Sequence, residues 1–313
     1  MPRIETQKAN IKQWGNKLWP YALLTIFTLY ILIEVVSHYL AHVATTVPSF
    51  KIPNKTPASY GLDYENITLV TNDNLHLKAW WLTKGTANLP TILIIHGLGA
   101  RKESMLSYIR VAQKNGFPVL ALDLRGHGES ESSLTTIGYY EQQDIISALA
   151  YLGSHNITNT ILWGTSMGAV IAIHVGAKQL DQTHAKISGI IADAPFDTLK
   201  ATLAHHGKLL YGLPEFPFMT VTYSKIERKM KFDLDAVNSL LAVKKLECPI
   251  LLLAAEHDVR MPVALVESIY QAAREPKYLW TIPKQNHEVR TFTCELEEQI
   301  LLFLEKCQTE EVF

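Results

Sequence analysis

The sequence predicts an α/β fold in which a mostly parallel sheet carries helices on both faces. Short runs of β-branched and aliphatic residues alternate with segments long enough to form helices, which is typical of right-handed crossovers between parallel strands. The runs are almost wholly apolar, as expected for strands that are buried on both faces. Six of them begin at Thr91, Phe117, Thr160, Ser188, Cys248 and Lys277.

An apolar stretch near the N-terminus, Tyr21 to Leu40, contains one charged residue, Glu34, in 20 positions. As a helix it is long enough to cross a hydrocarbon core of about 30 Å, although a carboxylate near the bilayer centre costs roughly 2.5 kcal/mol or more. We expect a single transmembrane anchor over residues 19–41, after a cytoplasmic N-terminus of residues 1–18. The alternatives are an amphipathic surface helix and a cleaved signal peptide, for which "AHVA" at residues 41–44 is a weak cleavage site.

The charges on either side of this stretch favour one orientation. Basic residues are more numerous before it (Arg3, Lys8, Lys12, Lys17) than just after it (Lys51, Lys55). Because positive charge collects on the cytoplasmic side, the folded domain is expected on the non-cytoplasmic side of the membrane. The glycosylation sequons at Asn54, Asn66 and Asn156 matter only if the domain enters a glycosylating compartment.

Composition excludes some classes of function. The chain has 313 residues with 29 basic and 30 acidic side chains, a net charge of −1 and no block of like charge, so no nucleic-acid partner is expected. Cys248, Cys294 and Cys307 are too few and too scattered for a disulfide framework or a zinc cluster. His205 and His206 are adjacent and have no acidic or cysteine partners nearby, so we predict no metal site.

The rest of the chain divides by pattern. Residues 42–60 hold three prolines and read as a semi-extended linker. The domain is expected over 61–308, opening with a β-hairpin in "ENITLVTNDNLHLKAWWLTKG" and closing with an amphipathic helix in "TFTCELEEQILLFLEKCQ", before a tail of 309–313. Residues 196–245 mix glycines, prolines, aromatics and basic residues, which indicates a helical lid. This lid either packs only on its own domain or also touches lipid headgroups or an acyl substrate.

The third apolar run leads into a serine between glycines. Gly164-Thr165-Ser166-Met167-Gly168 matches Gly-x-Ser-x-Gly, with a predicted strand before it and a predicted helix after it. Such a sharp turn brings strand and helix close together, and side chains two residues on either side of the serine would clash. The pattern alone is common by chance, and a small residue in a tight turn is the alternative, but its place between strand and helix makes Ser166 a candidate nucleophile.

An attacking serine needs hydrogen-bond donors for the oxyanion that forms. The N–H of Met167, directly after the serine, is one candidate. "HGLG" at residues 96–99 follows the first apolar run, and its glycines let the backbone turn the N–H of Leu98 toward the same point. A glycine-rich turn after a strand is common, so "HGLG" indicates an oxyanion site only in combination with the serine turn.

The serine also needs a general base and a carboxylate that orients it. Ligands meet a parallel sheet at the C-terminal ends of its strands, where Asp258 follows "PILLLAA" and His287 follows "YLWTIPKQN". The order Ser, Asp, His is the one found with this kind of serine turn. Asp193 also ends a strand and stays open as the carboxylate.

Other acidic residues and histidines fit these roles less well. Glu256 and Asp197 are weaker candidates for the carboxylate. His127 lies in a tight loop before the serine and is expected to structure that loop, whereas His174 lies within the helix after the serine and is expected in the core.

These motifs together resemble a known family. "HGLG", "ALDLRGHGES", "GTSMGA", "CPILLLAAEHDVRMP" and "NHE" occur in the order and spacing of the α/β-hydrolase superfamily, and the whole is similar to its serine-aminopeptidase-type (monoacylglycerol-lipase-like) branch over residues 65–305. The resemblance implies an α/β-hydrolase fold that needs no cofactor. It also implies roles for single residues, namely Ser166 as nucleophile, Asp258 as orienting acid, His287 as base, and Leu98 and Met167 as oxyanion donors.

The sequence therefore predicts a membrane-tethered serine hydrolase that cleaves carboxylic esters or thioesters through an acyl-enzyme. Its partners would be the membrane and a lipid or small-molecule acyl substrate. An aminopeptidase or amidase of the same fold is one alternative, but we identify no recessed acidic pair to bind a free amine. The alternative of another class is a catalytically inactive binding or scaffolding protein.

Overall fold

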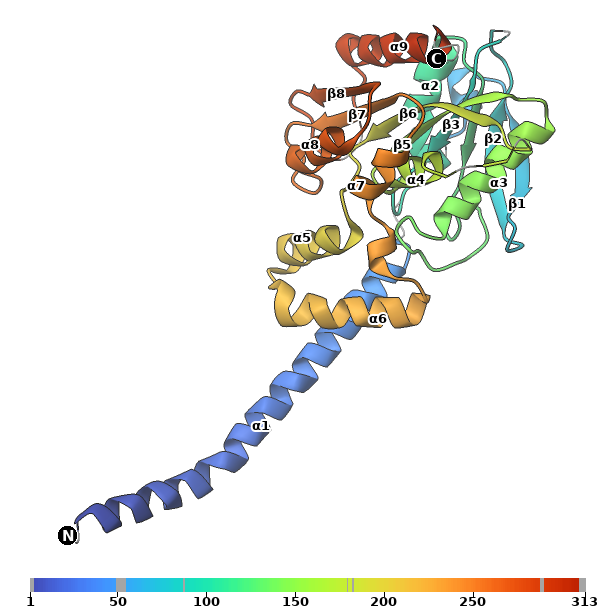
Figure 1. Ribbon diagram of the computed structural model, residues 1–313. Helices are drawn as coiled ribbons and strands as arrows, with labels where there is room; N and C mark the ends of the chain where they lie inside the picture. The colour runs from blue at the N-terminus through green and yellow to red at the C-terminus, as the bar shows by residue number, and fades with distance from the viewer. Residues whose placement is uncertain are drawn as a thin grey trace.

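One twisted sheet organises the folded domain (Figure 1). The computed structural model describes residues 3–48, 55–86, 88–178, 180–181, 183–287 and 290–309. Within these residues the strands follow the order β1-β2-β4-β3-β5-β6-β7-β8. They are β1 (Glu65–Val70), β2 (His76–Leu82), β3 (Thr91–Ile95), β4 (Val119–Leu122), β5 (Asn159–Thr165), β6 (Lys186–Asp193), β7 (Ile250–Ala255) and β8 (Lys277–Ile282). The pairs β1–β2 and β2–β4 are antiparallel and the other described pairs are parallel, so the predicted mostly parallel sheet is confirmed, with the predicted hairpin at one edge.

Helices cover both faces of the sheet and explain why its central strands are so apolar. They are α2 (Leu106–Lys114), α3 (Glu141–Ser154), α4 (Met167–Gly176), α8 (Val263–Ala272) and α9 (Cys294–Thr309). One apolar core joins α3, α4 and α8 to the sheet, and a second joins α2 and α9 to it. Strands β3 and β7 are buried along their whole length between these two cores. Residues 310–313 of the expected tail lie outside the described residues.

The insertion between β6 and β7 is built of helices. It contains α5 (Leu199–Tyr211), a short π-helical turn η3 (Glu215–Met219), α6 (Thr220–Met230) and the short elements η4 (Leu234–Ala236), α7 (Ser239–Ala242) and η5 (Val243–Lys245). Figure 1 shows α5 and α6 below the sheet, on the side from which the N-terminal helix extends. We refer to residues 196–245 as the lid.

The N-terminal helix α1 (Arg3–Thr45) is one continuous element. Its part from Trp19 to Thr45 is long and apolar enough to cross a membrane. Large apolar side chains are exposed along most of this part up to Val35; beyond it Leu40 and Ala41 are buried against the domain, while Tyr39 and Val43 stay exposed. In Figure 1, α6 crosses α1 near the domain.

The helix continues past the expected end of the anchor. Residues 42–45, which the sequence predicts as the start of a linker, are helical. The physical reason is that the last turn is docked on the domain, since the carbonyl of Thr45 accepts from the N–H of Thr135 at 3.1 Å and its hydroxyl accepts from Lys229 Nζ at 2.8 Å. Residues 49–54 of the expected linker lie outside the described residues.

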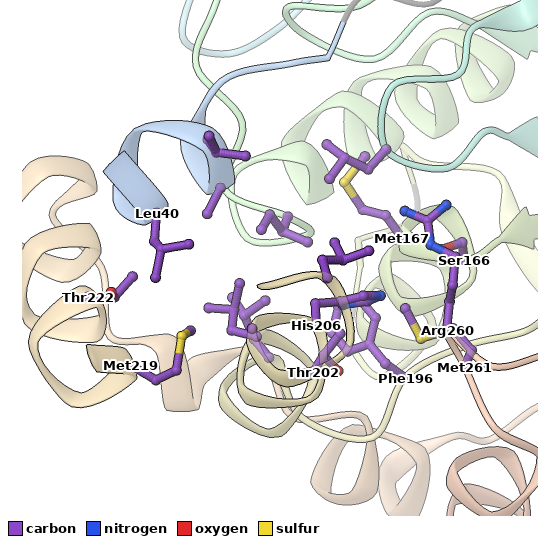
Figure 2. Close-up of a pocket in the computed structure, with 18 of the residues that line it drawn as sticks. Leu40, Ser166, Met167, Phe196, Thr202, His206, Met219, Thr222, Arg260 and Met261 are labelled. Carbon is purple, nitrogen blue, oxygen red and sulfur yellow. The ribbon is translucent and has the colours of Figure 1, made fainter. Parts of the chain in front are cut away.

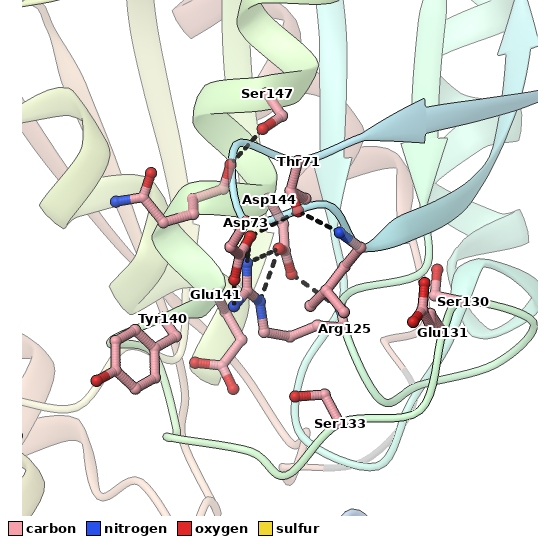
Figure 3. Close-up of polar contacts among 12 residues, drawn as sticks. Thr71, Asp73, Arg125, Ser130, Glu131, Ser133, Tyr140, Glu141, Asp144 and Ser147 are labelled. Atoms are coloured by element: carbon pink, nitrogen blue, oxygen red, sulfur yellow. Dashed lines mark hydrogen bonds and ion pairs between the residues drawn. The ribbon is translucent and has the colours of Figure 1, made fainter. Parts of the chain in front are cut away.

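Polar side chains fix the loop that follows β4 (Figure 3). The Arg125 side chain donates from Nε to Asp144 Oδ1 at 2.8 Å and from Nη1 to Asp73 Oδ2 at 2.8 Å, while its backbone N–H donates to Asp144 Oδ2. The side chains of Arg125 and Asp144 are 4% and 0% exposed. This group joins the β1–β2 turn, the end of β4 and the first turn of α3.

Glu141, three residues before Asp144 at the start of α3, binds the segment of residues 135–138. Its buried carboxylate accepts from the hydroxyls of Thr135 and Thr136 and from the N–H groups of Thr136 and Gly138, at 2.6–2.9 Å. The segment that contacts the end of α1 at Thr45 is therefore itself held rigidly.

Replacing Arg125 by Met should destabilise the protein strongly, because it leaves the Asp144 carboxylate buried without its charged partner. We expect a loss of about 3–5 kcal/mol in the free energy of unfolding, measured by denaturant unfolding of the full chain in detergent. The double variant Arg125→Met, Asp144→Leu removes both charges and should recover more than half of the loss. Equal instability of the single and double variants would show that the unpaired charge is not the cause.

Candidate active site

Ser166 occupies the turn between β5 and α4 in a backbone conformation that side chains rarely adopt. Its φ and ψ are 51° and −117°. The N–H of Ser166 donates to the carbonyl of Asp193 at 2.7 Å, and its carbonyl accepts from the N–H of Ala169 in the first turn of α4. Backbone strain of this kind is found mainly where the surrounding structure enforces it, typically at functional sites.

Two glycines make this turn possible. A Cβ atom on Gly164 would lie 2.2 Å from the carbonyl oxygen of Gly168, and one on Gly168 would lie 2.3 Å from the carbonyl oxygen of Ile95 in β3. Gly97 is also close, since a Cβ there would lie 3.2 Å from Ser166 Cβ. The clash that the sequence predicts on either side of the serine is therefore with backbone atoms, which cannot rotate away.

His287 and Asp258 form a close pair. His287 Nδ1 lies 2.7 Å from Asp258 Oδ2, and the other carboxylate oxygen accepts from the N–H groups of Arg260 and Met261 at 2.9 and 2.7 Å. Burial tends to raise the pKa of Asp258, but the hydrogen bonds from His287 and from these N–H groups together hold it below its ordinary value. The carboxylate is therefore ionised at neutral pH and orients the ring of His287.

The other carboxylate that the sequence left open has different partners. Asp193 accepts from Nε and Nη2 of Arg290 at 2.9 and 2.7 Å, and from the hydroxyl of Tyr108 at 3.2 Å. Arg290 and Asp193 are both buried, at 4% and 2% exposure. Asp193 thus balances a buried guanidinium, and the structure brings Asp258 to His287 instead. No pattern in the sequence pointed to Arg290.

The loop after β3 is tied to the end of β4. His96 is fully buried, and its Nε2 accepts from the N–H of Leu124 at 3.0 Å, so that Nδ1 carries the hydrogen and donates to the carbonyl of Gly97. Burial first, and the nearby His127 second, lower the pKa of His96 to about 3, so the ring is neutral. Lys102 Nζ contacts Asp123 Oδ2 at 2.6 Å in the buried base of the same loop.

Ser166, His287 and both expected oxyanion residues line one cavity of about 240 Å³. Figure 2 shows Ser166 and Met167 at one end and Leu40 at the other. Its other walls come from the end of α1, the loops after β3, β4 and β7, and the lid: Leu40, Val43, Ala44, Leu98, Ile137, Phe196, Leu199, Thr202, Leu203, His206, Gly207, Leu210, Tyr211, Met219, Thr222, Arg260 and Met261. Sequence reasoning did not predict that Leu40, Val43 and Ala44 of α1 would line the cavity.

Of three other histidines, His127 is buried, His174 is partly buried on α4 and His206 lines the cavity. His127 Nδ1 lies 2.9 Å from the carbonyl of Arg125, and burial lowers the pKa of both His127 and His174, the latter to about 4. Burial, followed by the charge of Arg260, also lowers the pKa of His206 to about 4. Within the described ranges, no group of three His, Cys, Asp or Glu side chains is placed to hold a metal ion.

Comparison with known proteins agrees with this architecture. A family model described as the alpha/beta hydrolase fold matches residues 90–218. The esterase Pf2001 of Pyrococcus furiosus superimposes with a TM-score of 0.68 and 25% identity, over 84% of this chain and 98% of the esterase. The uncharacterized protein YqkD of Bacillus subtilis is 28% identical over 76% of this chain and 75% of its own length.

The lysophosphatidylserine lipase ABHD12 of Xenopus tropicalis is 24% identical to this chain over 64% of the chain's length. The match covers 51% of that relative, so the chain spans about half of its length. The fold and these likenesses define an α/β hydrolase with esterase and lipase relatives. The family-model match and these relatives support the predicted α/β-hydrolase superfamily, and the fold is that of an α/β hydrolase. The predicted fold is thereby confirmed.

Gly168→Ala should be much more damaging than the same change at Gly176, eight residues later on α4. At Gly168 the new Cβ meets the backbone oxygens of Ile95 and His96, at 2.3 and 2.7 Å, whereas at Gly176 it meets the side-chain ends of Ile190 and Leu246. We expect a loss of about 3 kcal/mol or more at Gly168, and a smaller one at Gly176, where side chains repack and alanine favours the helix. Thermal unfolding measures both. Similar melting temperatures for the two variants would contradict the close approach.

Proposed function

We propose that this protein is a membrane-tethered serine hydrolase that cleaves carboxylic esters or thioesters of lipids or small acyl compounds through an acyl-enzyme. The observation that carries the proposal is that Ser166, on its strained turn, and His287, paired with Asp258, line the same cavity. The esterase and lipase names of the relatives support an ester as substrate. The excess of basic residues before the apolar part of α1 supports a domain on the non-cytoplasmic side of the membrane, which remains a prediction.

In this mechanism Ser166 Oγ attacks the acyl carbonyl while His287 Nε2 takes the hydroxyl proton. The N–H groups of Met167 and Leu98 stabilise the negative charge on the carbonyl oxygen, the kind of electrostatic contribution that is often the largest in catalysis. His287 then gives the proton to the leaving alcohol or thiol as its bond to the carbonyl carbon breaks. Water, deprotonated by His287, attacks the acyl-enzyme, and the carboxylic acid and free Ser166 are released. Asp258 keeps the imidazole oriented and stabilises its charged form.

The lining of the cavity favours an ester over the substrate of an aminopeptidase. A free amino group needs a carboxylate partner, and among the described residues that line the cavity none is acidic. Arg260, which does line it, would repel an ammonium group. Specific hydrolysis of aminoacyl arylamides would therefore favour the alternative enzyme class.

A fluorophosphonate probe should label the full chain covalently, and Ser166→Ala should abolish the labelling. Hydrolysis of p-nitrophenyl butanoate should fall by about 10³-fold or more, because the nucleophile and its covalent intermediate are lost. Ser154→Ala, at an exposed helix end, is the matched control and should be labelled like the parent. Labelling of Ser166→Ala at the parent's level would refute the nucleophile, and absence of both labelling and hydrolysis in the parent would favour a binding protein.

Asp258→Asn should lower kcat/KM for the same ester by about 10³- to 10⁴-fold at neutral pH, because an amide neither fixes the ring of His287 in the required tautomer nor stabilises its positive charge. Asp197→Asn, at a carboxylate that bonds only to the N–H of Thr198 among its described hydrogen bonds, should stay within a few-fold of the parent. Equal activities of the two variants would remove Asp258 from the mechanism.

A further inference from the structure

The cavity that reaches Ser166 has the membrane helix as its opposite wall. Leu40, Val43 and Ala44 of α1 line it together with the lid, and Figure 2 shows Leu40 near Thr222 and Met219 at the end away from Ser166. An acyl group bound at Ser166 that extends along this cavity reaches α1. The helix is therefore part of the site as well as an anchor.

Two polar contacts below this wall fix α1 to the lid. Glu34 Oε2 lies 2.6 Å from Lys225 Nζ on α6, and the hydroxyl of Ser37 donates to the carbonyl of Phe218 at 2.9 Å. The only charge that the sequence places within the apolar stretch is therefore neutralised by the lid. Because both contacts precede Leu40 in the chain, the lid reaches down the helix beyond the level of the cavity.

The exposed apolar surface of α1 becomes sparse where the lid begins. Large exposed apolar side chains are dense from Trp19 to Val35, and after Val35 only Tyr39 and Val43 of the large apolar side chains described in α1 remain exposed; Glu34, at the end of the dense stretch, is ion-paired to Lys225 of the lid. At 1.5 Å per residue this stretch is roughly 25 Å long, close to the hydrocarbon thickness of about 30 Å. A hydrocarbon layer that covers this stretch would have its upper boundary near the lower edge of the lid.

Apolar side chains of the lid are exposed at this level. Phe216 is 78% exposed and Leu210 57%, with Leu209 and Tyr211 also exposed. The ring of Tyr211 packs edge-on against that of Tyr39 on α1, with centroids 6.4 Å apart, so the patch is continuous with the surface of the membrane helix. Leu210 and Tyr211 also line the cavity, so the patch and the cavity share these two residues.

We propose, on the basis of the proposed function, that the substrate is a long-chain acyl ester resident in the leaflet around α1. Its acyl chain passes from the bilayer between α1 and the α5–η3 junction into the cavity, where Val43 and Ala44 bound it. The exposed Phe216 and Leu210 lie in the leaflet and keep this route out of water. The ester carbonyl then meets Ser166 beside Arg260.

Narrowing the α1 wall should change selectivity for chain length. For the full chain in phosphatidylcholine vesicles, Ala44→Phe should lower the ratio of kcat/KM for p-nitrophenyl hexadecanoate to that for the butanoate by at least ten-fold, because only the long chain reaches α1. Val35→Phe, on the exposed side of the same helix, should leave the ratio at the parent value. Fluorophosphonate labelling of Ala44→Phe verifies that its site is assembled.

The outcomes of that experiment are distinct. A ratio unchanged in the labelled Ala44→Phe variant overturns the role of α1, and so does an equal fall for both esters. If the parent neither hydrolyses the butanoate nor reacts with the probe, the proposed function itself fails.

A second measurement addresses the position of the lid. In vesicles of phosphatidylcholine brominated on its acyl chains, the emission that Phe216→Trp adds to the parent should be quenched strongly. The emission added by Leu302→Trp should not be, because Leu302 is exposed on α9, which Figure 1 shows on the opposite side of the domain from α1. Equal quenching of the two would overturn the contact between lid and leaflet.

Discussion

Backbone atoms of β3, β5 and α4 meet at Gly164 and Gly168 with no room for a Cβ atom, and the rest of the site depends on this close approach. It forces the turn that gives Ser166 its positive φ and places the first N–H groups of α4 beside the serine. It also brings the loop after β3, with Gly97, against Ser166 Cβ. The alignment of Ile95 with Gly164 in neighbouring parallel strands fixes the same geometry from the side of the sheet.

Much of this arrangement could be predicted because it is encoded locally. Buried parallel strands must be apolar on both faces, so each central strand is visible as a short aliphatic run. The serine turn needs glycines at fixed positions for steric reasons, and side chains at the C-terminal ends of parallel strands converge on one edge. Those rules made His287 and Asp258 candidate neighbours, with Asp193 left open as the carboxylate, and the structure places His287 Nδ1 2.7 Å from Asp258 Oδ2.

What sequence reasoning missed depends on pairing between distant residues. Asp193 and Asp258 both lie at or near the C-terminal ends of strands and cannot be told apart in the sequence. The structure distinguishes them because Arg290, 97 positions from Asp193, donates hydrogen bonds to the Asp193 carboxylate. In the sequence, Glu34 was expected to make insertion of the apolar stretch into a membrane less favourable. Its charge is paired with Lys225, which is 191 positions away and could not be recognised as its partner from the sequence. Local periodicity contains no information about such partners, and for the same reason it described α1 only as an anchor.

The docking of α1 on the lid also has a mechanical consequence. The contacts of Glu34, Ser37 and Thr45 join α1 to the lid at three points, and elements joined in this way are expected to move together. A helix in a bilayer thinner or thicker than its apolar length adjusts its tilt. With α1 in the bilayer as proposed, a change of tilt would rotate the lid and its cavity relative to the plane of the headgroups, and the thickness of the surrounding membrane would then influence access to Ser166.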